Sequence, residues 1–180
     1  MRYERYYNLS IKIRLCQAVC GLARWSAWEG GHVIGALVAR KVVRAGFIHL
    51  NKGDVSLLLS RWAEDVTLSY PGNMSVVSGT FKGKKTIEEW FNRFIEVFPK
   101  RDFTVKSVGV QNIFDFTGTN VVTAEWDVIV TNRESKDFRN SGVTVINSVR
   151  GRATSVCDYY FDIDALREAW GIASSKSIKS

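Results

Sequence analysis

The segment from Thr86 to Phe98 constrains the fold most, because its apolar residues recur at the spacing of one helix face. Thr86 and Glu89 form a capping-box pattern that predicts the start of this helix, and Pro99 ends it. An apolar stripe of this width must be covered by another layer of structure. The stripe comprises Ile87, Trp90, Phe91, Phe94, Ile95 and Phe98.

Strand-like runs flank this helix along the chain. Two short runs, 66–70 and 78–83, precede it, and four runs, 103–111, 121–131, 143–149 and 154–161, follow it. Periodicity predicts further helices over residues 33–49, 55–63 and 164–170, with Asp162 capping the last. This order indicates an α+β domain, in which a bent antiparallel sheet wraps around helices and leaves a cavity at its open end.

The positive charge is concentrated at the N-terminal end of the chain. The 180 residues carry a formal charge of +7, and residues 1–50 account for +6 of it, with eight basic and two acidic side chains. Because the remainder is nearly neutral, we expect no nucleic-acid partner. Residues 9–25 have the pattern of a basic amphipathic helix, which favours contact with a membrane surface, an ordinary packing helix being the alternative.

The sequence predicts one folded domain, residues 34–172, between a basic helical extension at 1–33 and a flexible Ser/Lys-rich tail at 173–180. Cys16, Cys20 and Cys157 form neither a disulfide framework nor a zinc motif, so we expect a cytoplasmic protein without a metal or cofactor. No apolar window reaches the roughly 20 residues that a membrane span needs, and no secretory signal is evident.

Five motifs carry a resemblance to a known family. They are LNKGD at 50–54, WAEDV at 62–66, YPG at 70–72, GTFKGKK at 79–85 and DYYFD at 158–162. In this order they resemble the SnoaL-like branch of the nuclear transport factor 2-like superfamily, which includes polyketide cyclases, ketosteroid isomerases and limonene epoxide hydrolases. The resemblance implies a cone-shaped barrel with an internal small-molecule pocket, often in a homodimer. It does not imply one reaction, because function depends on the site and not on the fold.

The resemblance also implies candidate catalytic residues. Asp127 and Asp158 match the two aspartates of limonene epoxide hydrolases, although Glu125 stands where that family has an arginine. Tyr70 stands where ketosteroid isomerases have their aspartate base. If the carboxylates share an apolar pocket, one pKa rises and the site holds both an acid and a base, with Tyr70 donating to an oxyanion.

Trp62, Trp90, Phe94 and Tyr160 are the candidates for the substrate-binding wall of this pocket. Alternation along 121–131 gives Glu125 and Asp127 a competing interpretation as the solvent face of a half-exposed strand. The opposite face of that strand is apolar and comprises Ala124, Trp126, Val128 and Val130.

Two functions follow as hypotheses. The first is an acid–base enzyme, of isomerase, cyclase, dehydratase or hydrolase type, acting on a small apolar molecule. The second is a non-catalytic module of the same fold that binds a ligand or forms a dimer.

Overall fold

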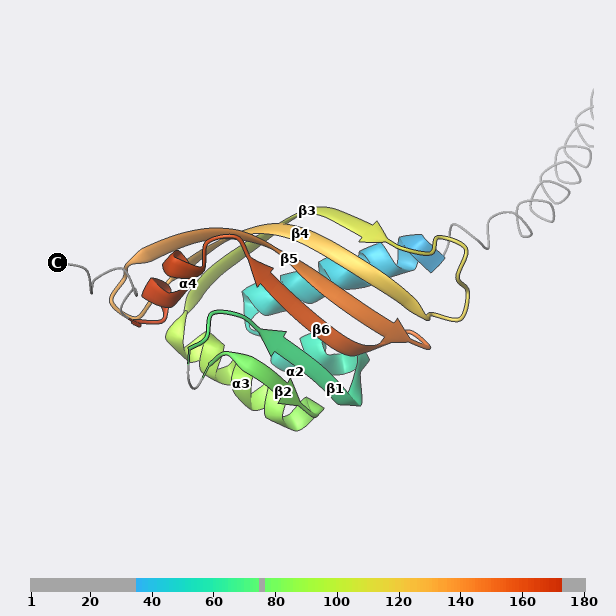
Figure 1. Cartoon of the computed structure of the whole chain (residues 1–180), viewed down its shortest axis with the longest axis horizontal. Helices are drawn as coiled ribbons and strands as arrows, with labels where there is room; N and C mark the ends of the chain where they lie inside the picture. The colour runs from blue at the N-terminus through green and yellow to red at the C-terminus, as the bar shows by residue number, and fades with distance from the viewer. Residues whose placement is uncertain (1–34, 75–76, 173–180) are drawn as a thin grey trace, which may run out of the picture.

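The computed structural model describes residues 35–74 and 77–172, which form helices packed against one six-stranded sheet (Figure 1). The first described element is a helix across residues 35–52. The elements that follow are α2 (Val55–Leu58), η1 (Leu59–Arg61), β1 (Trp62–Tyr70), β2 (Gly79–Lys82), α3 (Lys84–Val97), β3 (Lys100–Val110), β4 (Asn120–Thr131), β5 (Asp137–Val149), β6 (Arg152–Tyr160) and α4 (Ile163–Ala169). The α+β architecture predicted from the sequence is confirmed.

The sheet is mixed, with the strand order β2-β1-β6-β5-β4-β3. The prediction of a wholly antiparallel sheet is wrong at one pair, because β1 and β6 run parallel, with Leu68 opposite Val156. Both strands start at the same end of the sheet, where Trp62 faces Ala153. Within the described chain β2 and β3 are edge strands, so the sheet is bent but does not close into a barrel.

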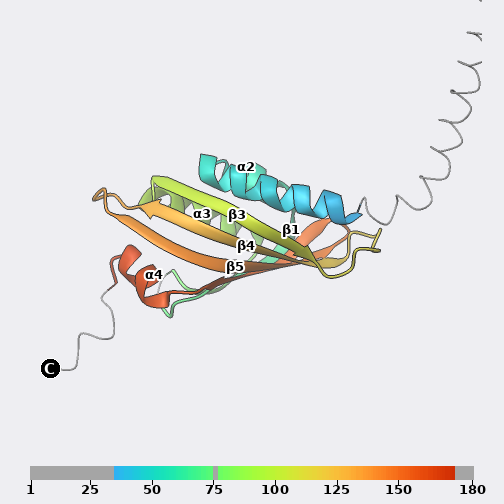
Figure 2. The ribbon, with the colours of Figure 1, turned by 90° about the horizontal axis from the view of Figure 1, so that it is seen from above.

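The helix across residues 35–52 runs along one face of the sheet (Figure 2). Asn51, from the LNKGD motif, attaches its end to β3. Its side chain accepts a hydrogen bond from the Phe103 amide at 2.8 Å and donates one to the Phe103 carbonyl at 3.0 Å. The rings of Phe47 and Phe103 also pack, with centroids 5.8 Å apart. Phe47 and Phe103 also line the space beneath the sheet, so this end of the helix borders that space.

The helix α3 starts earlier than the capping pattern predicts, so the assignment of Thr86 as its cap is wrong. Gly83 is the N-cap, with φ of 89°, a conformation that glycine adopts without strain. Its carbonyl accepts a hydrogen bond from the Ile87 amide at 3.1 Å. The aromatic stripe of α3 is buried as predicted.

Two other predicted helices have mixed outcomes. The helix expected over 55–63 ends at Arg61, because Trp62 already pairs with Ala153 in the sheet. Asp162 caps α4 as predicted, accepting a hydrogen bond from the Ala165 amide at 2.9 Å.

The basic extension at 1–33 and the tail at 173–180 lie outside the described residues. In the part of the chain that is described, no helix has the length and apolar character to cross a membrane.

Candidate functional site

A cavity of about 670 Å³ lies between the sheet, the helix across residues 35–52 and α3. This volume is in the range of small-molecule sites. Most of its wall is aromatic or aliphatic, as in a binding pocket for an apolar compound. Large apolar residues of the wall include Trp62, Leu68, Trp90, Phe94, Trp126 and Val156.

Asp158 is the carboxylate of β6 that faces this cavity. It is flanked on the same strand face by Val156 and Tyr160, because side chains alternate along a strand. Burial raises the pKa of the Asp158 carboxyl to about 6, although a hydrogen bond from Thr144 lowers it in part. Its side chain is half-buried and lines the cavity. A carboxyl with this pKa exchanges a proton readily near neutral pH.

Thr144 holds the Asp158 carboxylate in a fixed position. Its hydroxyl donates to Oδ1 of Asp158 at 2.6 Å and accepts from Nε1 of Trp126 at 2.9 Å. Thr144 is the single buried polar or charged residue of the described chain. An indole N–H can only donate, so the Thr144 hydroxyl must accept from Trp126. Its own single proton is then available for the bond to Asp158.

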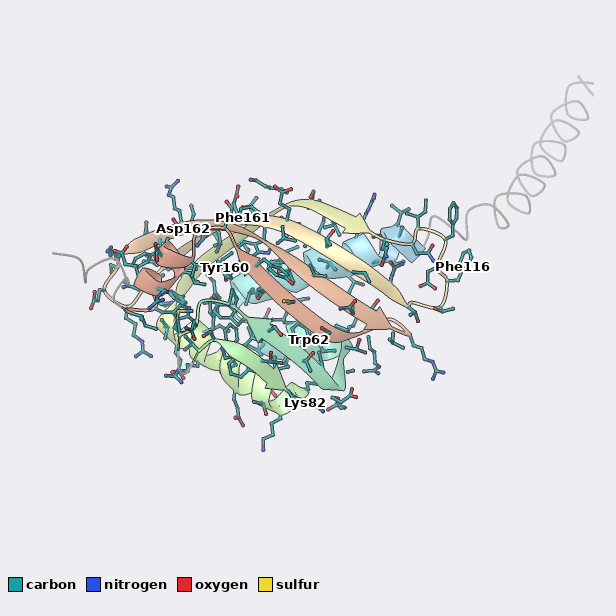
Figure 3. All side chains as sticks on the ribbon, viewed as in Figure 1. Trp62, Lys82, Phe116, Tyr160, Phe161 and Asp162 are labelled. Atoms are coloured by element: carbon teal, nitrogen blue, oxygen red, sulfur yellow. The ribbon has the colours of Figure 1, made fainter. Side chains whose placement is uncertain are left out.

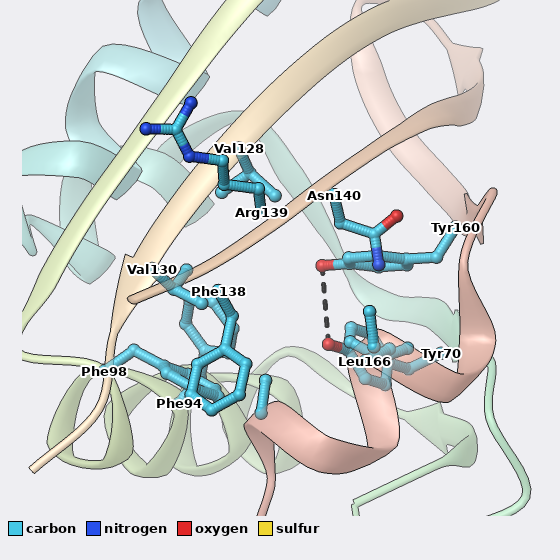
Figure 4. A pocket seen from close by; sticks show the side chains of 12 residues that line it. Tyr70, Phe94, Phe98, Val128, Val130, Phe138, Arg139, Asn140, Tyr160 and Leu166 are labelled. Atoms are coloured by element: carbon cyan, nitrogen blue, oxygen red, sulfur yellow. Dashed lines mark hydrogen bonds between the residues drawn. The ribbon is translucent and has the colours of Figure 1, made fainter. Parts of the chain in front are cut away.

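Two tyrosines lie beside this carboxylate. The Tyr70 hydroxyl donates a hydrogen bond to the Tyr160 hydroxyl at 3.4 Å (Figure 4). It accepts one from Nε1 of Trp170 at 3.3 Å. Burial is the main reason why the pKa values of both phenols lie well above 10, so both are protonated at neutral pH. The Tyr160 hydroxyl is therefore a donor, not a base, at a position that also lines the large cavity.

Asp127 and Glu125 lie on the other face of the sheet, so the expectation that they share the cavity with Asp158 is wrong. Asp127 is bound at the outer surface by Nζ of Lys106 at 2.9 Å and by the Ser141 hydroxyl at 2.6 Å. Glu125 accepts from the Ser107 hydroxyl at 3.2 Å on the same face. The physical reason is the alternation of β4, whose apolar residues, including Trp126, occupy the inner face.

The remaining candidates lie in the cavity wall. Tyr70, Trp62, Trp90, Phe94 and Tyr160 all line it, and the Tyr70 and Trp90 rings pack with centroids 4.7 Å apart. Their contact with a substrate stays a prediction. Among the described residues, no group of three or more His, Cys, Asp or Glu side chains could hold a metal ion.

A family model for the SnoaL-like domain matches residues 43–156. The chain belongs to the SnoaL-like domain family. The matched segment ends just before Asp158, so the family match covers most of the cavity wall but not this carboxylate. No curated protein matches the sequence significantly.

Solved structures support the same fold for this SnoaL-like domain. Bal32a, from a soil-derived mobile gene cassette, is 20% identical with a TM-score of 0.64, covering 77% of this chain and 98% of its own. A nuclear transport factor 2-like protein of Burkholderia pseudomallei is 17% identical with a TM-score of 0.62, covering 72% and 95%. TerC, crystallised with polyporic acid, is 21% identical with a TM-score of 0.62, again covering 72% and 95%. At these identities the likeness concerns the fold alone.

The sequence of this SnoaL-like domain did not identify Thr144 and Trp126 as the residues that orient the Asp158 carboxylate. A strand threonine carries no signal of its own, because threonine is common in strands for conformational reasons. The alternation of 143–149 identifies which residues share a face with Thr144, but only the pairing of β5 with β6 brings Thr144 opposite Asp158.

Proposed function

We propose that this SnoaL-like domain is an acid–base enzyme that moves a proton on a small, largely apolar carbonyl compound held in the cavity. The observation that carries the proposal is the position of Asp158. It is a carboxylate, oriented by Thr144, in a mostly apolar cavity of about 670 Å³. Reactions of this kind include isomerisation and aldol-type cyclisation.

Asp158 would act as the base. Because its pKa is about 6, the carboxylate predominates at neutral pH, while its conjugate acid is strong enough to return the proton. In the proposed step Asp158 takes a proton from the carbon next to the carbonyl. The C–H bonding pair forms the enolate double bond, and the carbonyl pair moves to oxygen. Asp158 then returns the proton to the same or another carbon.

Tyr160 would stabilise the enolate oxygen. Its hydroxyl accepts from Tyr70, so its own proton is free to point at an oxyanion in the cavity. The hydrogen bond from Trp170 to Tyr70 strengthens this donor by polarisation along the chain. Tyr70, the residue at the isomerase base position, would then support the donor rather than accept a proton.

Hydrogen–deuterium exchange tests the proposal without knowledge of the natural substrate. 2-Tetralone, an apolar bicyclic ketone, is incubated with the protein in D₂O, and loss of its α-proton NMR signals is measured. We expect acceleration over buffer by the unchanged protein and a loss of about 100-fold or more in Asp158→Asn. Asp127→Asn is the matched control, since this carboxylate lies on the outer face; it should keep the full rate.

The alternative function, a non-catalytic binding module, makes the opposite prediction. Such a module would bind 2-tetralone, seen as a change in tryptophan fluorescence, without accelerating exchange. Equal exchange rates for the unchanged protein and Asp158→Asn would also contradict the assignment of Asp158 as the base.

A further inference from the structure

The mouth of the cavity is identified by residues that line it and are also exposed. Val38 on the first helix, Leu57 on α2 and Phe116 in the β3–β4 loop each line the cavity and expose more than half of their surface. Tyr70 and Tyr160 line its other end, beside α4. In Figure 3, Phe116 and Tyr160 accordingly lie toward opposite ends of the molecule.

Two cationic side chains belong to this mouth. Lys41, on the same helix flank as Val38, and Arg61, at the end of η1, are both exposed and both line the cavity. Neither forms an ion pair or a side-chain hydrogen bond among the described residues, whose ion pairs involve other lysines and arginines. A pair of cations without an ion-pair partner at the rim of an apolar cavity attracts an anionic group.

Neither acidic residue of the cavity wall forms an ion pair with these cations, and because the Asp115 carboxylate is ionised, Lys41, Arg61 and Asp115 together carry a net charge of +1. Asp115 is bound within its own loop, where Oδ1 accepts from the Thr117 hydroxyl at 2.7 Å and from the Thr117 amide at 3.1 Å. Asp158 lies far along β6 from the mouth. The strand start pairs Ala153 with Trp62, next to Arg61, and five further residues at about 3.3 Å each separate Ala153 from Asp158 by roughly 16 Å.

We propose that the ligand of this cavity is an amphiphile, with an apolar body inside and a carboxylate, sulfonate or phosphate group at the mouth between Lys41 and Arg61. The proposal rests on the cavity being the ligand site of the proposed function. The roughly 16 Å along β6 gives the approximate scale of the separation between the anionic group and the atoms that face Asp158. The opposite ends of the cavity therefore select opposite ends of one elongated molecule.

Two fluorescent probes that differ in one sulfonate test this inference. 8-Anilino-1-naphthalenesulfonate carries the anionic group, and N-phenyl-1-naphthylamine is the same ring system without it. Affinities are measured by fluorescence titration at low ionic strength for the full chain, for Lys41→Gln/Arg61→Gln and for Arg40→Gln/Arg93→Gln. The last variant loses the same charge from exposed positions that do not line the cavity.

We expect the unchanged protein to bind the sulfonate probe about tenfold more tightly than the neutral probe, because two charge-assisted contacts are available. Lys41→Gln/Arg61→Gln should abolish this preference while keeping the affinity for the neutral probe within about twofold. The control variant should keep the preference, and the neutral probe should displace the sulfonate probe from the same cavity.

Equal affinities of the two probes, or an unchanged preference in Lys41→Gln/Arg61→Gln, would contradict the proposed anion site. Neither result would contradict the proposed function. An equal loss of both probes in that variant would also overturn the anion site, since the cations would then act on the cavity shape. Failure of both probes to bind the unchanged protein would instead contradict the proposed function.

Discussion

The Thr144 hydroxyl on β5 donates a hydrogen bond of 2.6 Å to the Asp158 carboxylate on the neighbouring strand β6. The same hydroxyl accepts from the Trp126 indole on β4 at 2.9 Å. Three adjacent strands therefore cooperate to hold one carboxylate at the cavity. This arrangement costs stability, since a carboxylate in an apolar cavity has lost most of its water.

Asp158→Asn should stabilise the protein at neutral pH. The pKa of Asp158, about 6, lies above its unfolded value near 3.9, so the folded state binds the proton more tightly. Ionisation between pH 4 and pH 6 therefore lowers the free energy of unfolding, and the loss persists above pH 6. We expect a gain of about 2 kcal/mol at pH 7.5 and almost none at pH 4, measured by urea unfolding. Destabilisation at pH 7.5 would contradict this account.

Asp127→Asn is the control for this effect, because its environment is opposite. The hydroxyl of Ser141 and the ammonium of Lys106 lower the pKa of Asp127 below its ordinary value. Its contribution to stability is therefore present above the unfolded pKa and is lost as the pH falls. Asp127→Asn should give no gain at pH 7.5.

Thr144→Val should destabilise the protein and raise the pKa of Asp158 above 6. The substitution removes the hydrogen bond that partly lowers this pKa, and it leaves the buried Trp126 indole without its acceptor. We expect a loss of about 2 kcal/mol in urea unfolding and an upward shift in the carboxyl ¹³C NMR titration of Asp158. Thr144→Ser, which keeps the hydroxyl, should show a much smaller change in both; a Val variant with an unshifted titration would reject the proposed orientation.

Tyr160→Phe should lower the α-proton exchange rate by about 100-fold, the usual cost of losing one oxyanion donor. The ring is kept, so its packing on Trp126, with centroids 4.9 Å apart, is preserved. Tyr70→Phe should have the smaller effect, since Tyr70 acts through Tyr160. A larger loss in Tyr70→Phe, from the same NMR measurement, would favour Tyr70 as the residue that contacts the substrate.

Gly142→Ala should destabilise the sheet beneath the site. A Cβ at this position would overlap the Tyr159 carbonyl oxygen and lie 2.6 Å from Cη2 of Trp126. We expect a loss of about 2 kcal/mol in thermal unfolding, as for overpacked core sites. Gly46→Ala is the contrasting change. Its nearest new neighbour is Cδ1 of Leu58 at 3.5 Å, and helix propensity should stabilise it by up to about 1 kcal/mol; equal effects of the two changes would contradict the packing argument.

The two aspartates show what the sequence could and could not predict. Both were candidates from the family resemblance, but only Asp158 faces the cavity. For Asp127 the alternation of β4 gave the right answer, because burying Trp126 on the inner face turns Asp127 outward. Apolar periodicity reports directly on burial, whereas a family motif that lacks one of its residues transfers only in part, here at Asp158 and not at Asp127. Glu125 stands where limonene epoxide hydrolases have an arginine, and this difference was the sign that the whole motif does not transfer.

The fold itself was largely predictable from the sequence, and each departure from the prediction has a physical cause. The stripe of α3 gave the helix correctly, but the positive φ of Gly83 moved its start ahead of Thr86. The parallel pairing of β1 with β6 was missed, because strand direction depends on contacts between residues far apart in the chain. The Thr144–Asp158 hydrogen bond arises from such a pairing and has no local pattern.

The pH dependence of 2-tetralone exchange, measured together with the carboxyl ¹³C titration of Asp158, tests the central claim most directly. The account predicts that both curves have the same midpoint, at about pH 6, and that the rate rises as the carboxylate forms. Exchange catalysed by the protein with a midpoint far from the titration of Asp158, or unchanged in Asp158→Asn, would contradict it.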